Sequence, residues 1–316
     1  MDALKAAFGK EIQKQANKVL GDVMNKVSGS DIKIPGALKE EERPSVVPFQ
    51  SDCSGRKKAV FVGINYFKSK AELFGCINDV KNVKSFIIQN YGFVQENIKT
   101  FTDEPGSGNE MPTRANIINA LKWLASGATS GDSLFFHYSG HGGTARDLDG
   151  DEVDNFDETI LPSDFEEAGQ ILDDEIHAIL VAALPVGVRL TAIFDSCHSG
   201  SALDLPWHGM DAVKHLLSAG GNEEARKKAE KERTNTDADV IQFSGCRDDQ
   251  TSADARIDGQ PTGAASFALL SCLRANPNQN YTELLQNMRK TLAGKYTQVP
   301  QLSTAHPIDL NVAFNL

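Results

Sequence analysis

A histidine and a cysteine stand in two glycine-flanked segments that could carry nucleophilic catalysis. His141 lies in YSGHGG (residues 138–143), and Cys197 lies in DSCHSG (residues 195–200). A histidine lowers the pKa of a neighbouring thiol and can later protonate a leaving amine, so the pair suits a thiolate nucleophile. The glycines permit close backbone approach, and the N–H groups of Gly142 and Cys197 could form an oxyanion hole. We therefore predict Cys197 as nucleophile and His141 as its base.

Each of these residues alone has a more common explanation. A single cysteine after a strand is usually a small buried hydrophobic residue, and a single histidine in a glycine-rich turn is usually structural. A cysteine phosphatase of the usual form is excluded, because its arginine would stand six positions after the cysteine, where the chain has Leu203. The serine elbow G-x-S-x-G is absent around Ser139 and Ser199.

Apolar patterning predicts the elements that must position the pair. Strands are predicted at 58–64, 98–101, 133–138, 189–194, 239–243 and 308–312, and helices at 78–90, 114–125, 174–183, 264–274 and 281–292. Alternating strands and helices predict an α/β fold with a mostly parallel sheet covered on both faces. Ligands bind beyond the carboxyl ends of such strands, which is where both segments stand.

Composition narrows the class of protein. The chain has 316 residues, 40% hydrophobic and 24% charged, enough for one large domain or two small ones. Its net charge of -11 makes it a poor ligand for nucleic acid or an anionic membrane. Five scattered cysteines without a CxxC pair argue against a disulfide framework or structural zinc. With neither a signal-peptide pattern nor a transmembrane span, we expect a cytoplasmic or nuclear protein that is not secreted.

The first 56 residues differ from the rest. Apolar residues recur at helical spacing over 1–28, and 29–56 is rich in proline, glycine and charge, which is typical of a linker. The helix could pack on the main domain, bind a partner, drive oligomerisation or lie on a membrane surface. The catalytic region is predicted at 57–316.

Four segments in order resemble a metacaspase, a member of the caspase-like peptidase family. They are GCINDV (75–80), YSGHGG, DSCHSG and SGCRDDQTSAD (244–254), and the resemblance runs from about residue 57 to 316. It implies a caspase-like αβα sandwich, a His141–Cys197 dyad and a monomer. It also implies a p20-like part at about 57–220, a processing loop at about 221–239 and a p10-like part at about 240–316.

The resemblance also implies the substrate class. Caspases carry glutamine two residues before the nucleophile and cut after aspartate, whereas this chain has Asp195 there. A carboxylate favours a basic P1 side chain and repels an acidic one, so arginine- or lysine-containing substrates are expected. Similarity to the family places Cys76, Asp79 and Ser139 in the same S1 pocket. Asp79 could instead be a favourable charge at a helix amino terminus.

A calcium site is implied by the same family. The corresponding residues are Asp157, Asp173, Asp174 and Asp204, all hard oxygen donors of the kind that Ca²⁺ prefers. Asp173 and Asp174 could instead cap the predicted helix. The acidic stretch 147–158 is not predicted to be an EF-hand, because its sixth position is Glu152 where glycine is needed.

The charged stretch 222–239 offers basic residues to an enzyme that cuts after them. The candidate autocleavage residues are Arg226, Lys227, Lys228, Lys231 and Arg233. Any exposed loop contains such residues, so a solvated loop is the alternative. A competing hypothesis of a different class is a non-proteolytic scaffold or aggregate-binding protein with the same fold.

Overall fold

The structure, a computed structural model, describes most of the chain beyond residue 50. The described residues are 51–146, 156–196, 202–205, 207–208, 236, 238–245, 255–257, 260–294, 296, 298–306 and 310–316. They all belong to one unit, Val46–Leu316. The predicted N-terminal helix and most of its linker lie outside the described residues, so the predicted domain boundaries stay predictions.

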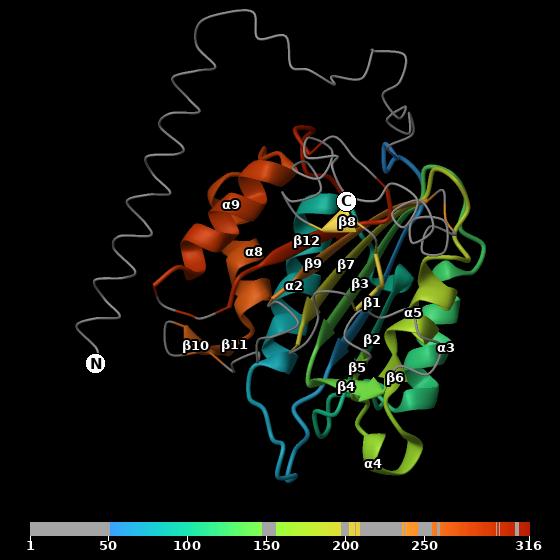
Figure 1. Cartoon of the computed structure of the whole chain (residues 1–316), viewed down its shortest axis with the longest axis vertical. Coiled ribbons are helices and arrows are strands. Elements are labelled where there is room, and N and C mark those ends of the chain that lie inside the picture. Colours follow the sequence, from blue (N-terminus) through green and yellow to red (C-terminus); the bar gives the residue numbers. More distant parts are fainter. Residues whose placement is uncertain are drawn as a thin grey trace, which may run out of the picture. The chain divides into compact units, whose positions relative to one another are not determined.

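A seven-stranded sheet forms the centre of the described region (Figure 1). In spatial order its strands are β2 (Ile98–Thr102), β1 (Lys57–Gly63), β3 (Ser133–Ser139), β7 (Arg189–Asp195), β9 (Asp239–Ser244), β12 (Gln301–Thr304) and β8 (Trp207–His208). The first five strands are parallel, and β12 pairs antiparallel with both β9 and β8. This arrangement confirms the predicted α/β class with a mostly parallel sheet.

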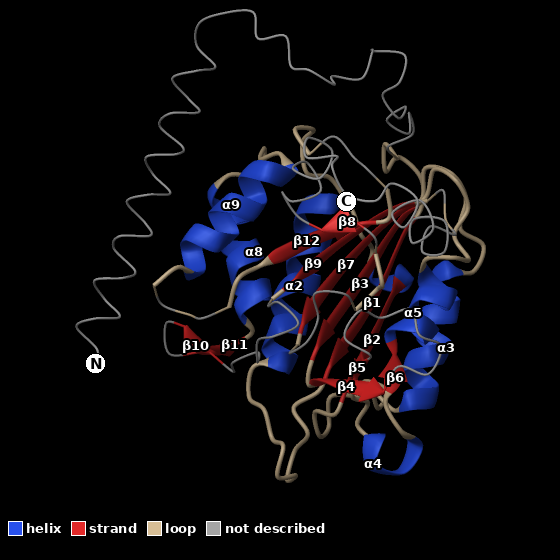
Figure 2. Ribbon diagram, viewed as in Figure 1, coloured by secondary structure: helices blue, strands red, loops and turns tan. Residues whose placement is uncertain are grey.

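Helices cover both faces of the sheet (Figure 2). One face carries α2 (Cys76–Tyr91), α8 (Ala264–Ala275) and α9 (Tyr281–Leu292), and the other carries α3 (Arg114–Ala125) and α5 (Asp173–Leu180). Each of these five helices was predicted to within a few residues. No helix in the described part of the chain is long and apolar enough to cross a membrane.

The side chains of β3 alternate between the two faces. Leu134, Phe136 and Tyr138 belong to the core under α3 and α5, whereas Phe135 belongs to the core under α2, α8 and α9. Successive side chains of a strand point to opposite faces, so Ser139 shares the side of Phe135. The strand is buried on both faces, which explains its continuous apolar sequence.

Several short elements surround the ends of the sheet. β4 (Gly142–Arg146), β5 (Phe156–Ile160) and β6 (Ile171–Leu172) form a small antiparallel sheet directly after His141. The remaining elements of the described residues are the 3-10 turn η2 (Gln95–Asn97), α4 (Phe165–Ala168) and the hairpin of β10 (Ala255–Ile257) with β11 (Gln260–Thr262). The sequence did not predict them, because such short segments carry too little periodicity.

The predicted strand at 308–312 is wrong. The described residues 310–312 form a turn, and the last strand of the sheet is β12 instead. The Leu310 carbonyl accepts a hydrogen bond from the Thr282 N–H at the start of α9 (3.1 Å). Leu310 and Val312 pack against the core under α9, so the alternating apolar pattern reflects packing beside a helix.

Candidate active site

The neighbouring strands β3 and β7 bring the two catalytic segments to one end of the sheet. Ser139 and Asp195 are register partners at the ends of these strands, and the Gly140 N–H donates to the Asp195 carbonyl (3.4 Å). His141 follows Ser139 by two residues, and Cys197 follows Asp195 by two. Paired strands lie about 4.8 Å apart, so the chain leaves the sheet at adjacent points. Cys197 itself lies outside the described residues.

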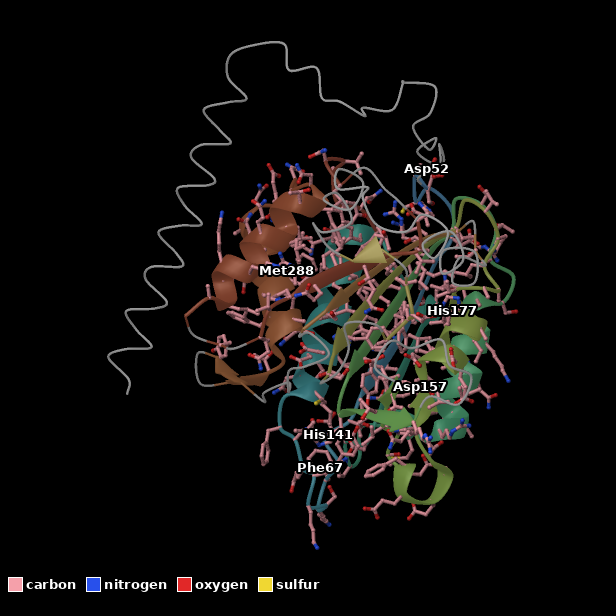
Figure 3. The ribbon with its side chains drawn as sticks, in the orientation of Figure 1. Asp52, Phe67, His141, Asp157, His177 and Met288 are labelled. Atoms are coloured by element: carbon pink, nitrogen blue, oxygen red, sulfur yellow. The ribbon has the colours of Figure 1, made fainter. Side chains whose placement is uncertain are left out.

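The loop between β1 and α2 orients the imidazole of His141. Its Nε2 lies 2.8 Å from the Ala71 carbonyl oxygen. Because a carbonyl oxygen can only accept, Nε2 carries a proton, and in the neutral ring Nδ1 does not. Nδ1 is therefore the nitrogen that can accept a proton from a thiol. Figure 3 shows His141 at the opposite end of the sheet from Asp52.

Tyr66 supports His141 in two ways. The two ring centroids are 4.8 Å apart, and the His141 backbone N–H donates to the Tyr66 hydroxyl (3.0 Å). This hydroxyl in turn donates to the Leu161 carbonyl (2.6 Å), and burial raises the pKa of Tyr66, which keeps the donor protonated. Tyr138 completes the network by donating to the His141 carbonyl (2.7 Å). The sequence did not indicate Tyr66, because no spacing rule connects residues so far apart in the chain.

The Asp79 carboxylate is buried in the first turn of α2. It accepts hydrogen bonds from the Ser139 hydroxyl (2.9 Å), the Gly263 N–H (2.8 Å) and the Thr262 hydroxyl. Burial, and then the negative charge of Asp195, raise the pKa of Asp79 well above its usual range. These three donors, which are the ones that the described part of the chain supplies to the Asp79 carboxylate, are all neutral groups. A buried carboxylate in such a setting favours the approach of a cation.

Asp195, at the end of β7, faces the amino terminus of α8. Its carboxylate accepts from the backbone N–H groups of Ala265 (3.4 Å) and Ser266 (2.8 Å), where the helix carries partial positive charge. A Cβ atom at Gly263 would lie 2.2 Å from this carboxyl group. The absence of a side chain at Gly263 therefore lets the segment before α8 pack directly on Asp195.

Two more buried residues lie close to these carboxylates. Cys76 lies in the first turn of α2, three residues before Asp79, so the two share a helix face. His137 on β3 places Nε2 2.9 Å from the Ser266 hydroxyl oxygen. Burial lowers the pKa of His137 to about 3, so this neutral ring does not offset the negative charge. The sequence did not single out His137.

The aspartates of the predicted calcium site lie on and around β5 and α5. Asp157, Asp173 and Asp204 are buried, and Asp174 is partly buried in the first turn of α5. Burial, and then the neighbouring Glu158 carboxylate, raise the pKa of Asp173 to about 9. Glu158, the twelfth position of the acidic stretch 147–158, also donates its N–H to Asp173 (3.2 Å).

These aspartates do not form a ready-made metal site. Among the residues that the structure describes, no three or more His, Cys, Asp or Glu side chains are grouped so that they could hold a metal ion. Glu158, the last position of the acidic stretch, belongs to strand β5. The calcium assignment therefore stays a prediction.

The remaining predicted residues are only partly described. Gly142 begins β4 and pairs with Ile160, and its N–H stays a predicted oxyanion donor. The candidate autocleavage residues lie outside the described residues: Arg226, Lys227, Lys228, Lys231 and Arg233.

A parallel α/β sheet that delivers a histidine and a cysteine at neighbouring strand ends is the arrangement of a cysteine-dependent hydrolase. Comparison with known proteins narrows this class. Residues 57–206 match the family model of the metacaspase, peptidase C14 domain. Metacaspase-1 of Scheffersomyces stipitis is 48% identical, over 84% of this chain and 74% of the relative. Metacaspase-1 of Emericella nidulans is 47% identical with the same coverage.

This chain therefore belongs to the metacaspase family and is a cysteine endopeptidase. The fold also resembles that of protein GSU0716 from Geobacter sulfurreducens. That match has a TM-score of 0.58 and 24% sequence identity, and it covers 83% of this chain and 98% of the other.

Proposed function

We propose that this metacaspase cleaves peptide bonds after arginine or lysine. The observation that carries the proposal is the proximity of the two buried carboxyl groups of Asp79 and Asp195. A guanidinium or ammonium group would supply the positive charge that the neutral donors to Asp79 do not. An acidic P1 side chain would bring a further carboxylate to this pair and be repelled.

In the proposed reaction, Cys197 is the nucleophile and His141 is the general base and acid. His141 Nδ1 takes the thiol proton as the sulfur attacks the substrate carbonyl carbon. The N–H groups of Gly142 and Cys197 stabilise the oxyanion. The C–N bond then breaks as His141 gives its proton to the leaving amine. A water molecule, deprotonated by His141, then attacks the thioester carbon. The C–S bond breaks, and His141 returns the proton to the Cys197 thiolate.

A set of matched fluorogenic peptides tests this specificity. The peptides differ only in a P1 residue of arginine, lysine, citrulline or aspartate, where citrulline has nearly the shape of arginine without its charge. We expect kcat/KM for arginine to exceed that for citrulline by about 100-fold, since a charge-assisted contact is worth about 2–3 kcal/mol. The Cys197→Ala variant controls for contaminating peptidases. Equal turnover of the arginine and aspartate peptides would reject the proposal.

Calcium activation is the second part of the proposal. Its support is the buried pair of Asp173 and Glu158, since a nearby cation would offset the repulsion that raises the pKa of Asp173. Isothermal titration calorimetry should detect Ca²⁺ binding to the wild type and weaker binding to Asp173→Asn. Asp52→Asn, at the other end of the sheet, is the matched control. Absence of binding heat in the wild type at millimolar Ca²⁺ would reject this part.

Self-processing in the loop 222–239 is the third part. Its support is the group of basic residues in the segment that connects β7 to β9. These two strands are neighbours in the sheet. Incubation with Ca²⁺ should produce two fragments whose new amino terminus follows Arg226, Lys227, Lys228, Lys231 or Arg233. Cys197→Ala should remain intact under the same conditions, and its fragmentation at the same rate would contradict self-processing.

A further inference from the structure

Thr262 joins the C-terminal part of the domain to the proposed S1 pocket. It is the last residue of β11 and is buried, and its hydroxyl donates to Oδ1 of Asp79. We infer that Thr262 is a positioning residue for substrate specificity, because its hydroxyl holds the Asp79 carboxylate in the orientation that receives a basic P1 side chain. This inference rests on the proposed arginine and lysine specificity.

Thr262 binds a different oxygen of the Asp79 carboxylate from the other two donors. The Ser139 hydroxyl and the Gly263 N–H both donate to Oδ2, whereas Thr262 donates to Oδ1. A carboxylate has about four lone-pair sites, so these three donors leave room for an incoming cation. Without the Thr262 hydroxyl, Oδ1 would lose the contact that fixes the rotation of the carboxyl group about its last bond.

The segment that contains Thr262 also contacts the second carboxylate. Asp195 accepts from the N–H groups of Ala265 and Ser266, and Gly263 packs against its carboxyl group. The stretch from Thr262 to Ser266 therefore contacts both acids at once. Of the four groups that it donates to them in the described structure, three are backbone N–H groups. The Thr262 hydroxyl is thus the contact that a substitution can remove without altering the backbone.

Charge explains why the loss should affect basic substrates in particular. A hydroxyl donor stabilises the ionised form of a carboxylate. Asp79 is buried beside Asp195, and both conditions favour its neutral form. Removing the Thr262 hydroxyl therefore shifts Asp79 further toward the neutral form, which attracts a guanidinium group less. A neutral P1 residue of similar shape gains little from the charge and should lose little.

Thr262→Val and Thr262→Ser test the inference in the full chain. Valine keeps the shape of threonine without the hydroxyl, whereas serine keeps the hydroxyl. For the arginine peptide, Thr262→Val should raise KM about tenfold and leave kcat within about twofold, because a hydrogen bond to a charged group is worth about 1.5 kcal/mol or more. Thr262→Ser should restore a KM close to that of the wild type. The KM of the citrulline peptide should change by less than about twofold.

Thr282→Val is the matched control. Its hydroxyl donates to the Leu310 carbonyl (3.3 Å) at the start of α9, so it removes a hydroxyl outside the pocket, and its KM for the arginine peptide should equal that of the wild type. If Thr262→Val does not fold, as judged by circular dichroism and thermal melting, Thr262→Ala takes its place against Thr262→Ser.

The outcomes separate this inference from the proposed function. If the wild type does not prefer arginine, the proposed specificity itself fails. If the wild type prefers arginine but Thr262→Val leaves its KM unchanged, the positioning role of Thr262 is overturned. Equal losses on the arginine and citrulline peptides would also overturn it, because they would indicate general damage to the fold.

Discussion

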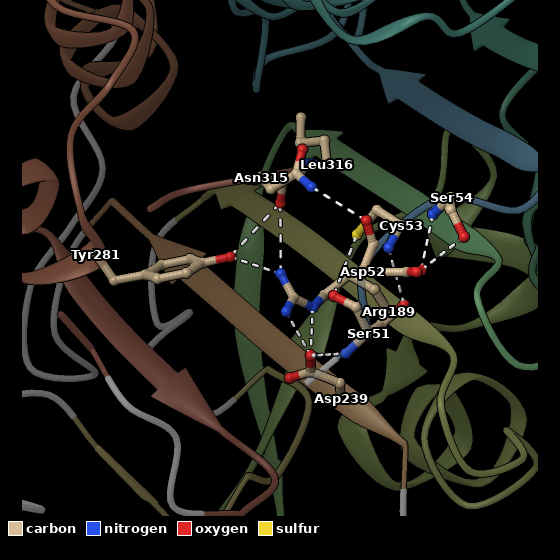
Figure 4. A network of polar contacts seen from close by, with 9 residues as sticks. All are labelled: Ser51, Asp52, Cys53, Ser54, Arg189, Asp239, Tyr281, Asn315 and Leu316. Atoms are coloured by element: carbon tan, nitrogen blue, oxygen red, sulfur yellow. Dashed lines mark hydrogen bonds and ion pairs between the residues drawn. The ribbon is translucent and has the colours of Figure 1, made fainter. Parts of the chain in front are cut away.

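Buried carboxylates lie at both ends of the central sheet, but they are satisfied differently. At the amino end, Asp239 begins β9 and pairs with Arg189, its register partner at the start of β7. Arg189 Nε donates to Asp239 (2.7 Å), and its guanidinium also donates to the Tyr281 hydroxyl (2.6 Å), as Figure 4 shows. At the carboxyl end, the donors described for Asp79 are the neutral groups of Ser139, Thr262 and Gly263.

The difference separates a structural acid from one that can bind a ligand. A buried charge is costly unless it is paired, and removal of one partner of a buried pair costs about 3–5 kcal/mol. The protein supplies the partner of Asp239 itself, so that charge is internally neutralised. For Asp79, the raised pKa reports an unfavourable setting for the ionised form, which a substrate cation would relieve. A buried aspartate thus stabilises the fold at the amino end, as Asp239, and is available to bind a cationic ligand at the carboxyl end, as Asp79.

The largest expected effect is a loss of peptidase activity at the carboxyl end of the sheet. His141→Ala should reduce kcat for the arginine peptide about 10³-fold, because it removes the general base and acid. Its free energy of unfolding should fall by no more than about 1.5 kcal/mol, the value of the hydrogen bond to Ala71.

The matched control is His177→Ala on α5, whose Nδ1 also contacts a backbone carbonyl, that of Leu203 (2.8 Å). Initial rates at a fixed Ca²⁺ concentration, together with urea unfolding, give both quantities. If the two histidine variants lose the same activity, His141 is not the catalytic base.

The second effect concerns the amino end. Asp239→Asn should lower the free energy of unfolding by about 3–5 kcal/mol, because it leaves the Arg189 guanidinium buried without its counter-ion. The exposed pair of Lys81 and Glu104 provides the control, and Glu104→Gln should lower it by less than about 1 kcal/mol. Urea unfolding measures both. The ratio of kcat/KM for the arginine and citrulline peptides should not change, and a change would show that this pair also acts on the S1 pocket.

The third prediction is that Asp79→Asn, unlike Asp239→Asn, does not lower the free energy of unfolding at neutral pH. Because the folded protein raises the pKa of Asp79, the folded state binds its proton more tightly than the unfolded chain. This contribution to stability is present at low pH and is lost as pH rises through the folded pKa. At neutral pH, Asp79→Asn should therefore keep or increase the free energy of unfolding, while kcat/KM for the arginine peptide falls about 100-fold.

Urea unfolding at several pH values checks that sign. The wild type should lose more stability than Asp79→Asn between acidic and neutral pH. If Asp79→Asn instead destabilises the protein as strongly as Asp239→Asn at neutral pH, both acids are structural and the contrast between the two ends fails.

The smallest expected effect concerns the support of the catalytic histidine. Tyr66→Phe removes the hydroxyl that accepts the His141 N–H and donates to Leu161. We expect kcat to fall about tenfold with an unchanged KM, since the loss of about 1.4 kcal/mol would act on the positioning of the base. The control is Tyr91→Phe, because the Tyr91 ring packs against Phe314 on the other face of the sheet. If the two variants have similar kcat values, the Tyr66 hydroxyl is not needed to position His141.

The sequence alone determined the parallel α/β class and the ends of the strands that carry chemistry. Apolar runs in a doubly covered sheet are long enough to locate β1, β3 and β7, and YSGHGG and DSCHSG begin at the carboxyl ends of two of them. The same local reasoning failed at 308–312. A pattern of alternating apolar residues does not say whether the backbone will pair with a strand or, as Leu310 does, with the start of a helix.

Only the tertiary structure decided which groups surround the site. It placed Ala71 and Tyr66 on His141 and brought Thr262 to Asp79 across 183 positions of the chain. It also showed that Asp239 has a cationic partner, whereas the described donors to Asp79 are neutral. Periodicity reports the face on which a residue lies, but hydrogen bonds between distant segments depend on register and packing. The chemistry of an acid in this protein is therefore set by neighbours that its local sequence does not contain.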